Sequence, residues 1–319
     1  MQGMLKRIVI VCSALLILVV LAKFAHADLF QTYTPANSDN SSGSSTNIAA
    51  TPPDTLSYAD ALFNSTDQPA WQTRTDLFYD FQQKNTPVFG FETIQPLYEC
   101  CGNNFFGQGR GGYTDGGVAF NLGLGYRYLT ANKKLMLGIN TFYDEIFRYP
   151  HKRVGLGGEV FTPYITLRAN FYDAYTGQRY TGNNTYERAS SGFDAGIETP
   201  VPYISWMRFT LKGYYWKGNR APNVTGGLVN LRVYPARQVE LAVGYANDNS
   251  QHSQAFINLN YYFGSPDFIQ YSASTCHPSP LFAAQDLEKI HLEKVLRTNE
   301  IVVEKRQGLS QPTIVARTD

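Results

Sequence analysis

Serine, histidine and aspartate, the residue types of a hydrolytic site, gather near position 250. Asp248, Ser250, His252 and Ser253 are close in sequence, and His151 lies in a second polar stretch. A serine hydroxyl beside an imidazole base suits hydrolysis by nucleophilic attack. Polar residues of this kind are common in any loop, however, and the histidines lack metal-ligand spacing. We therefore expect no enzyme activity, no catalytic or cofactor-binding residues and no metal site.

Glycines could be taken for a phosphate-binding loop at Gly155, Gly157 and Gly158 (GLGG), and again at Gly123 and Gly125. They fall inside expected strands with no helix behind them, so the dinucleotide-binding interpretation fails on its context. Glycine at such positions makes room inside a sheet or allows it to bend.

Strict alternation of large apolar residues with small or polar ones governs the stretch 118–129 (VAFNLGLGYRYL). Successive side chains of a strand point to opposite faces, so the two sets line two different environments. The same alternation recurs along most of the chain. It predicts about twelve strands, near residues 77–83, 87–97, 104–111, 116–128, 133–145, 153–161, 163–174, 190–199, 205–216, 225–234, 236–247 and 253–263.

The connections between these strands alternate in character. After the fourth, sixth, eighth and tenth strands they are short or contain proline, whereas after the fifth, seventh and ninth they are longer and polar. This asymmetry is typical of a transmembrane barrel with periplasmic turns and outer loops. We predict an all-β, up-and-down antiparallel transmembrane barrel over residues 75–263, because a closed barrel satisfies every backbone hydrogen bond in a bilayer.

The polar side chains of the alternating strands should then line the barrel interior. Acids and bases are nearly balanced there, which favours mutual ion pairs over a selectivity ring of one sign. The expected lumen-facing polar residues are Glu92, Asn121, Arg127, Asn140, Asp144, Glu159, Arg168, Asn170, Asp194, Glu198, Arg208, Lys212, Arg232 and Glu240.

Composition agrees with a barrel, with 22 Tyr, 20 Phe, 27 Gly and only 17% charged residues. The net charge of +1 argues against a nucleic-acid partner. A mean hydropathy of −0.27 excludes a bundle of transmembrane helices. A soluble jelly-roll or lectin-like sandwich is the structural alternative, but its outer face would carry more Lys and Glu.

The N-terminal region contains two expected segments. Residues 1–27 combine Lys6 and Arg7, an apolar run and a small-residue site at 25–27, which indicates a cleavable signal peptide; an uncleaved anchor is the alternative. Residues 28–74 are rich in Ser, Thr, Asn and Pro, so we expect a disordered periplasmic linker.

The C-terminal region, 264–319, comprises a linker, a segment with helical spacing and a polar tail. Apolar residues over 281–296 recur at helical intervals, which predicts an amphipathic helix. The tail either stays loose in the periplasm or enters the lumen as a plug and continues outward. A disulfide between Cys276 and either Cys100 or Cys101 is the natural pairing in an exported chain.

Several runs resemble the β-domain of the intimin and invasin family, the inverse autotransporters. They occur in the family's order: PLYECCGNNFFGQGR, NLGLGYRYL, LMLGINTFYDE, HKRVGLGGE, LRANFYDAYTG and RTNEIVVEKR. The resemblance covers roughly residues 75–306. The last run is similar to the family's segment after the barrel and carries Arg297, Asn299, Ile301, Val302 and Glu304.

The resemblance implies a twelve-stranded outer-membrane barrel with a periplasmic N-terminus, a helix in the pore and a C-terminal passenger threaded to the cell surface. It also implies insertion by the outer-membrane barrel assembly machinery. Few residues follow Arg306, so we expect a translocator without a folded passenger, and adhesion does not carry over. It would present its short tail and the 174–189 loop to a surface receptor of unknown identity; a small-solute channel or structural barrel with a periplasmic tail is the alternative.

Overall fold

The computed structural model describes residues 70–319 except 115–116, 268–280, 309–311 and 316–319. The expected signal peptide, the linker up to residue 69 and Cys276 lie outside the described residues. The last part of that linker is ordered, because a 3-10 turn, η1 (Gln72–Arg74), leads into the first strand. The expected lack of structure is therefore wrong for these residues.

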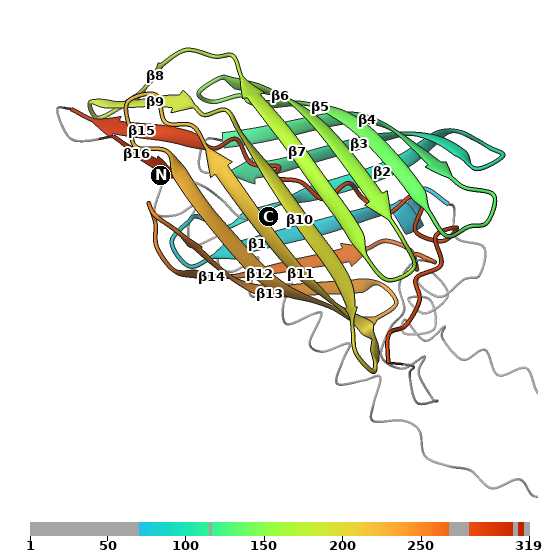
Figure 1. The fold of residues 1–319 in the computed structure, drawn as a ribbon. Helices are drawn as coiled ribbons and strands as arrows, with labels where there is room; N and C mark the ends of the chain where they lie inside the picture. The colour runs from blue at the N-terminus through green and yellow to red at the C-terminus, as the bar shows by residue number, and fades with distance from the viewer. Residues whose placement is uncertain (1–69, 115–116, 268–280, 309–311, 316–319) are drawn as a thin grey trace, which may run out of the picture. The chain divides into compact units, whose positions relative to one another are not determined.

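Twelve antiparallel strands close into a barrel, in which β1 pairs with both β2 and β14 (Figure 1). The predicted all-β barrel is confirmed. Among the described residues, no helix has the length and apolar character needed to cross a membrane. The barrel strands are β1 (Thr75–Gln82), β2 (Val88–Cys100), β3 (Asn103–Thr114), β4 (Gly117–Leu129), β5 (Met136–Ile146), β6 (His151–Phe161), β7 (Thr166–Ala174), β10 (Gly192–Val201), β11 (Ile204–Trp216), β12 (Val224–Ala236), β13 (Val239–Asp248) and β14 (Gln254–Tyr262).

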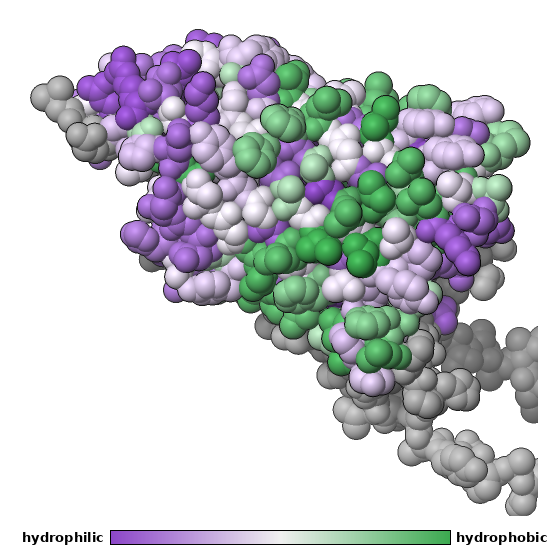
Figure 2. Space-filling view, in the orientation of Figure 1, coloured by the Kyte–Doolittle hydropathy of each residue, from purple (hydrophilic) through white to green (hydrophobic). Residues whose placement is uncertain are grey.

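Strand β4 shows why the alternating pattern produces a barrel with a polar interior. Val118 and Leu124 are 53% and 57% exposed on the outer face, whereas Asn121 and Arg127 are 4% and 1% exposed on the inner face. Figure 2 shows apolar residues gathered over the strands and hydrophilic ones over the region of β8, β9 and β15. An apolar outer band around a polar interior is typical of a barrel in a bilayer.

The two ends of the barrel differ in their connections. One end, here called the turn end, carries the short connections 101–102, 130–135, 162–165, 202–203 and 237–238. The other, here called the loop end, carries the long connection 175–191 and the connection 217–223. The connection after β5 is shorter than predicted, since His151 and its neighbours begin β6 instead of lying in a loop.

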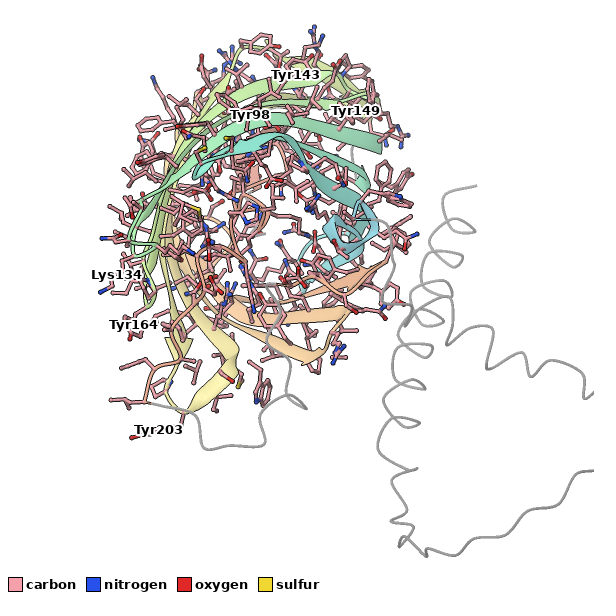
Figure 3. The ribbon with its side chains drawn as sticks, turned by 90° about the vertical axis from the view of Figure 1, so that its right-hand side faces the viewer. Tyr98, Lys134, Tyr143, Tyr149, Tyr164 and Tyr203 are labelled. Atoms are coloured by element: carbon pink, nitrogen blue, oxygen red, sulfur yellow. The ribbon has the colours of Figure 1, made fainter. Side chains whose placement is uncertain are left out.

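Exposed tyrosines mark the outside of the wall at or beside the turn end. Tyr98, Tyr164 and Tyr203, labelled in Figure 3, are each at least about half exposed there. Aromatic rings at this level match the interfacial girdle of membrane barrels.

A second, four-stranded sheet was not predicted from the sequence. It has the order β16-β15-β9-β8 and joins the loop hairpin after β7 to the C-terminal segment. The register of β15 on β9 runs from Val303 opposite Ala189 to Gln307 opposite Thr185. Its strands are β8 (Arg179–Gly182), β9 (Thr185–Ala189), β15 (Val303–Gln307) and β16 (Thr313–Val315).

The predicted amphipathic helix over 281–296 is wrong. These residues form turns over 287–292 and have no regular secondary structure over 293–296. Barrel side chains take the place of helical hydrogen bonds: Arg127 donates to the carbonyls of His291 and Glu293, and the backbone N–H of Val295 donates to Gln108. Helical spacing in sequence is a weak guide where partners outside the segment satisfy the backbone.

Glycines on the inner face of β4 make room for aromatic rings. A Cβ at Gly125 would lie 2.1 Å from the ring of Phe106, and one at Gly123 would lie 2.2 Å from the ring of Phe142. Both rings pack in one cluster with Leu292 and Val295. The glycines therefore allow the wall and the interior segment to pack against each other.

Gly125→Ala is expected to lower the free energy of unfolding by about 1–3 kcal/mol, because the Phe106 ring must leave its position. Denaturant unfolding of the refolded protein in micelles measures this change. Gly158→Ala is the matched control, since no atom lies within 4 Å of its added Cβ. Equal stability of the two variants would contradict the packing role of Gly125.

Candidate functional site

Residues 287–304, here called the lumen segment, run through the barrel from the turn end to the loop end. Thirteen consecutive residues from Leu292 to Glu304 are buried, apart from the half-buried Leu296. Figure 1 shows this segment, in red, passing through the barrel and continuing into β15. The candidate site is therefore the barrel lumen, and its occupant is part of the same chain.

Apolar packing closes the lumen around the segment at the turn end. Leu287 and Ile290 form a buried cluster with barrel side chains at this end, namely Met136, Phe161, Tyr234 and Tyr262. At the exposed rim, Lys133 Nζ lies 2.8 Å from Glu288 Oε1. The hydrogen bond that the Lys133 ammonium donates to the Glu288 carboxylate raises the pKa of Lys133.

Arg127 orients the segment just inside the turn end. Its Nη1 donates to the carbonyl oxygen of His291 at 2.9 Å and to that of Glu293 at 2.7 Å. Its Nη2 also lies 2.8 Å from Glu159 Oε2, and this ion pair compensates the charge of the buried guanidinium. A planar guanidinium suits such multiple contacts.

Two neighbouring residues of the segment carry opposite charges into opposite parts of the lumen. Glu293 Oε1 lies 3.0 Å from both Arg208 Nη1 and Arg232 Nη1. Lys294 Nζ donates to the two carboxylate oxygens of Asp76 at 2.9 and 2.8 Å. Each charge is buried, and such a charge is tolerated because a partner compensates it.

Asp144 receives two arginines from different sources. Arg297 of the segment makes a two-pronged contact with it, at 2.8 and 2.5 Å, and Arg153 of β6 adds a third bond at 2.8 Å. Arg153 also donates to the backbone carbonyls of Thr298 and Glu300. Asp144 thus links the wall directly to the side chain of Arg297, and through Arg153 to the backbone of the segment.

Further polar residues of the wall continue this contact toward the loop end. Thr298 donates through its hydroxyl to Asp194 at 2.8 Å and through its N–H to the Tyr172 hydroxyl at 2.8 Å. Asn121 donates to the carbonyl of Asn299 at 3.0 Å, and Asn170 to that of Leu296 at 3.3 Å. The wall therefore satisfies backbone groups that a helix would have satisfied internally.

Apolar clusters close the loop end as well. Val302 and Ile314 pack with residues that include Trp216 and Tyr172, and Ile301 and Val303 pack in a separate cluster that includes Ile146. The segment is thus enclosed by apolar side chains at both ends and held by charges between them.

The carboxylate of Glu304 caps a loop at this end. It accepts hydrogen bonds from the backbone N–H of Asn219 at 2.7 Å and of Arg220 at 3.1 Å. These donors belong to the connection between β11 and β12, so one side chain ties β15 to that connection.

Glu304→Ala is expected to weaken the attachment of β15 by about 1–3 kcal/mol, because two partly buried N–H groups lose their acceptor. Amide hydrogen exchange of β15 and of residues 217–223 should increase together. Glu304→Gln keeps one acceptor oxygen and should lose less. Unchanged exchange in Glu304→Ala would show that the pairing with β9 alone holds the strand.

Comparison with known proteins identifies the family. The family model described as "Inverse autotransporter, beta-domain" matches residues 35–299. The chain belongs to the inverse autotransporter β-domain family. The chain is 28% identical over 243 residues to the inverse autotransporter adhesin YeeJ of Escherichia coli (strain K12), across 72% of this chain and 10% of YeeJ.

Other relatives of this inverse autotransporter β-domain agree. Intimin of Escherichia coli O157:H7 is 25% identical, across 68% of this chain and 24% of intimin. The chain thus spans less than a quarter of the length of these two relatives. A solved structure from work on the in-meso crystallization of membrane proteins aligns with a TM-score of 0.60 and 22% identity, over 73% of this chain and all of that one, and shares the fold. The protein is an outer-membrane barrel, and its family is of the adhesin and translocator type, not an enzyme family.

The structure places all the expected lumen-facing residues of this β-domain on the inner side of the wall. Lys212 is half-buried and the others are buried. Those that contact the lumen segment directly are Glu92, Asn121, Arg127, Asp144, Arg168, Asn170, Asp194, Arg208, Lys212 and Arg232. Glu92 lies 3.5 Å from Lys294, whereas Glu159, Glu198 and Glu240 pair with arginines of the wall. Asn140 lies beside Gly157, where an added Cβ would meet its side chain.

The family-like segment after the barrel is the part of the lumen segment nearest the loop end. Arg297 contacts Asp144, Asn299 lends its carbonyl to Asn121, Ile301 and Val302 enter the two apolar clusters, and Glu304 caps the connection 217–223.

Sequence reasoning missed several residues of this site. On the wall they are Asp76, Gln108 and Arg153; in the segment they are Glu293 and Lys294. The period-2 pattern of β1 could have found Asp76, had the strand been started at Thr75. Glu293 and Lys294 lie between the apolar positions of the helix predicted over 281–296, so the helical pattern places them on a polar face and gives no sign that they are buried.

The segment does not fill the lumen completely. A cavity of about 100 Å³ remains beside it, with Lys212, Asn230, Asn258 and Asn260 among its lining residues. Its polar lining and size suit a few water molecules.

The hydrolytic set considered from the sequence is not assembled. The hydroxyl of Ser250 donates to the carbonyl of Ile314, and Asp248 accepts from the N–H groups of Ser250 and Gln251. His151 is buried in β6, with Thr176 as its hydrogen-bond neighbour. In the described ranges, no group of His, Cys, Asp and Glu has the geometry of a metal site.

Cys100 and Cys101 lie at the turn end with exposed thiols that form no disulfide among the described residues. Cys101 and Gly102 form the two-residue connection from β2 to β3, and both have positive φ, at 54° and 81°, as a type I′ turn requires. A hydrogen bond with Cys100 raises the pKa of the Cys101 thiol. The bridge to Cys276 remains a prediction, because that residue lies outside the described ranges.

Proposed function

We propose that this chain is a translocator: its barrel guides its own C-terminal segment through the lumen and then holds it there. The observation that carries this proposal is the continuous burial of residues 292–304 between the barrel walls, ending in a strand paired with the loop hairpin. A loose tail on the turn-end side would make none of these contacts.

The proposed orientation puts the turn end in the periplasm and the loop end outside the cell. Short connections at one end and the long 175–191 connection at the other support it, since membrane barrels have short periplasmic turns and longer outer loops. Export by an N-terminal signal peptide and insertion by the barrel assembly machinery belong to the same proposal. Outer-membrane lipid would contact the apolar outer band.

The presented surface would be the four-stranded sheet of the loop hairpin and the C-terminal segment. Its exposed residues include Arg179, Tyr180 and Gln307. The proposal includes a receptor for this surface only in general terms, as an extracellular partner that binds without a change in the barrel.

Surface labelling of intact cells tests the proposal. One epitope follows Asp319, a second is inserted between Asn183 and Asn184, and a third lies in the 130–135 turn. We expect the first two to be labelled on intact cells and the third only after permeabilisation. Labelling of the loop epitope without the C-terminal one would overturn the translocator proposal.

Passage of small solutes is a second candidate, and the cavity beside Asn230 and Asn258 is the observation that favours it. The lumen segment would then narrow a channel instead of closing it. Conductance of the intact and truncated chains separates the two candidates, as argued below.

A further inference from the structure

We infer that the lumen is a binding site for a non-helical peptide with one order of charges, and that Glu293, Lys294 and Arg297 are the signal that stops the segment in register. This inference rests on the proposed translocator function and names what the lumen recognises. The recognised class is apolar, acidic, basic, apolar, any residue, basic, as in Leu292 to Arg297.

The first observation is the separation of charge around the wall. Three arginines that face Glu293 come from β7, β11 and β12: Arg168 at 3.8 Å, and Arg208 and Arg232 at 3.0 Å each. The carboxylates that face Lys294 come from β1 and β2: Asp76 at 2.8 Å and Glu92 at 3.5 Å. In the order of the closed barrel, β13 and β14 separate these two groups on one side and β3 to β6 on the other.

The second observation is that Glu293 and Lys294 are adjacent in sequence and both buried, yet pair with these two different groups of the wall. Both pairings form together only in one register. Moving the chain by one residue would place either the carboxylate of Glu293 against acids or the ammonium of Lys294 against arginines.

Apolar neighbours prevent a slip of two residues. Leu292 and Val295 flank the charged pair and belong to the cluster of Ile94, Phe106 and Phe142. A two-residue slip would move one of the two charges into the place of Leu292 or Val295, against these rings. Arg297 adds a third fixed point, because its two-pronged contact with Asp144 requires a matching orientation of both groups.

Stopping in register has a consequence at the loop end. The β15–β9 pairing begins at Val303, six residues after Arg297, so the charged contacts determine which residues of the segment meet β9. A segment without this charge order would not be held at one position. The signal thus sets how much of the chain stands outside the barrel.

A cysteine pair measures the register directly. Thr185 and Gln307 are Cα partners in the β9–β15 ladder, and a Thr185→Cys, Gln307→Cys protein forms a disulfide under mild oxidation if the register is native. Cys100, Cys101 and Cys276 are replaced by serine in this background. The charge order is reversed by Glu293→Lys with Lys294→Glu, which keeps composition and net charge.

The matched control reverses another acid–base pair of the same segment, by Glu288→Lys with Lys289→Glu. Both side chains are exposed at the turn end. We expect the Glu293/Lys294 reversal to lower the yield of the cross-link by at least about tenfold, and the control reversal to change it less than about twofold.

The outcomes separate the inference from the proposed function. Absence of the cross-link in the unreversed protein would remove the translocator proposal itself. A full cross-link in both the unreversed and the reversed proteins would overturn the register signal and leave the translocator in place. Barrel folding is checked by the heat-dependent shift in gel mobility. If the reversal impairs folding, the Glu293→Gln, Lys294→Gln variant is used in its place. A cross-link yield in that variant as high as in the unreversed protein would equally overturn the inference.

Discussion

Asp144→Ala is expected to destabilise the folded protein by about 3–5 kcal/mol, because it leaves two buried arginines without their carboxylate. Arg297 and Arg153 both contact Asp144, and Asn121 donates to it at 2.7 Å. The side chains of Asp144, Arg153 and Arg297 are at most 1% exposed, so water cannot replace the lost partner. Denaturant unfolding of the refolded protein in micelles measures the loss.

Asp173→Ala serves as the control for this prediction. Asp173 is an exposed carboxylate near the loop end of β7 that accepts one hydrogen bond from Ser191. Its replacement should change the unfolding free energy by less than about 0.5 kcal/mol. The double variant Asp144→Ala, Arg297→Met should lose less than the sum of the two single changes, since each removes the same contact. Additive losses would show that the contact contributes nothing to holding the segment.

Removal of residues 281–319 is expected to raise single-channel conductance in planar bilayers by at least about tenfold. The deletion removes Leu287 and Ile290 from the turn-end cluster, and Val302 and Ile314 from the loop-end cluster. It also empties the middle of the lumen, whose wall is polar and charged. Water and ions would then pass through a space that the segment occupies in the intact protein.

A deletion of residues 28–69 is the control, because it shortens the chain without touching the described barrel. Its conductance should equal that of the intact protein. If the intact protein already conducts as well as the 281–319 deletion, the segment does not close the pore, and the small-solute channel becomes the better explanation. The conductance of the variant with Glu293 and Lys294 reversed should lie between the conductances of the two deletion variants.

The sequence alone determined the barrel and which side chains face its interior. Both follow from the period of two along a strand, which is a local property: once Val118 and Leu124 face lipid, Asn121 and Arg127 must face inward. Closure also follows, since a bilayer leaves no unpaired edge. The family resemblance added the expectation of a segment in the pore, and it singled out residues 297–304 as similar to the family's segment after the barrel.

The tertiary structure alone decided what lies in the lumen and what it contacts. The spacing of Leu287, Ile290 and Val295 predicted a helix, but the barrel wall supplies hydrogen bonds and apolar contacts that replace those of a helix. These wall residues are distant in sequence, so a local pattern cannot reveal them. The pairing of β15 with β9 and the meeting of Lys294 with Asp76, 218 residues away in sequence, depend in the same way on closure of the barrel. Local periodicity thus specified the barrel wall, whereas the conformation of the segment inside it depends on contacts with wall residues that are distant in sequence.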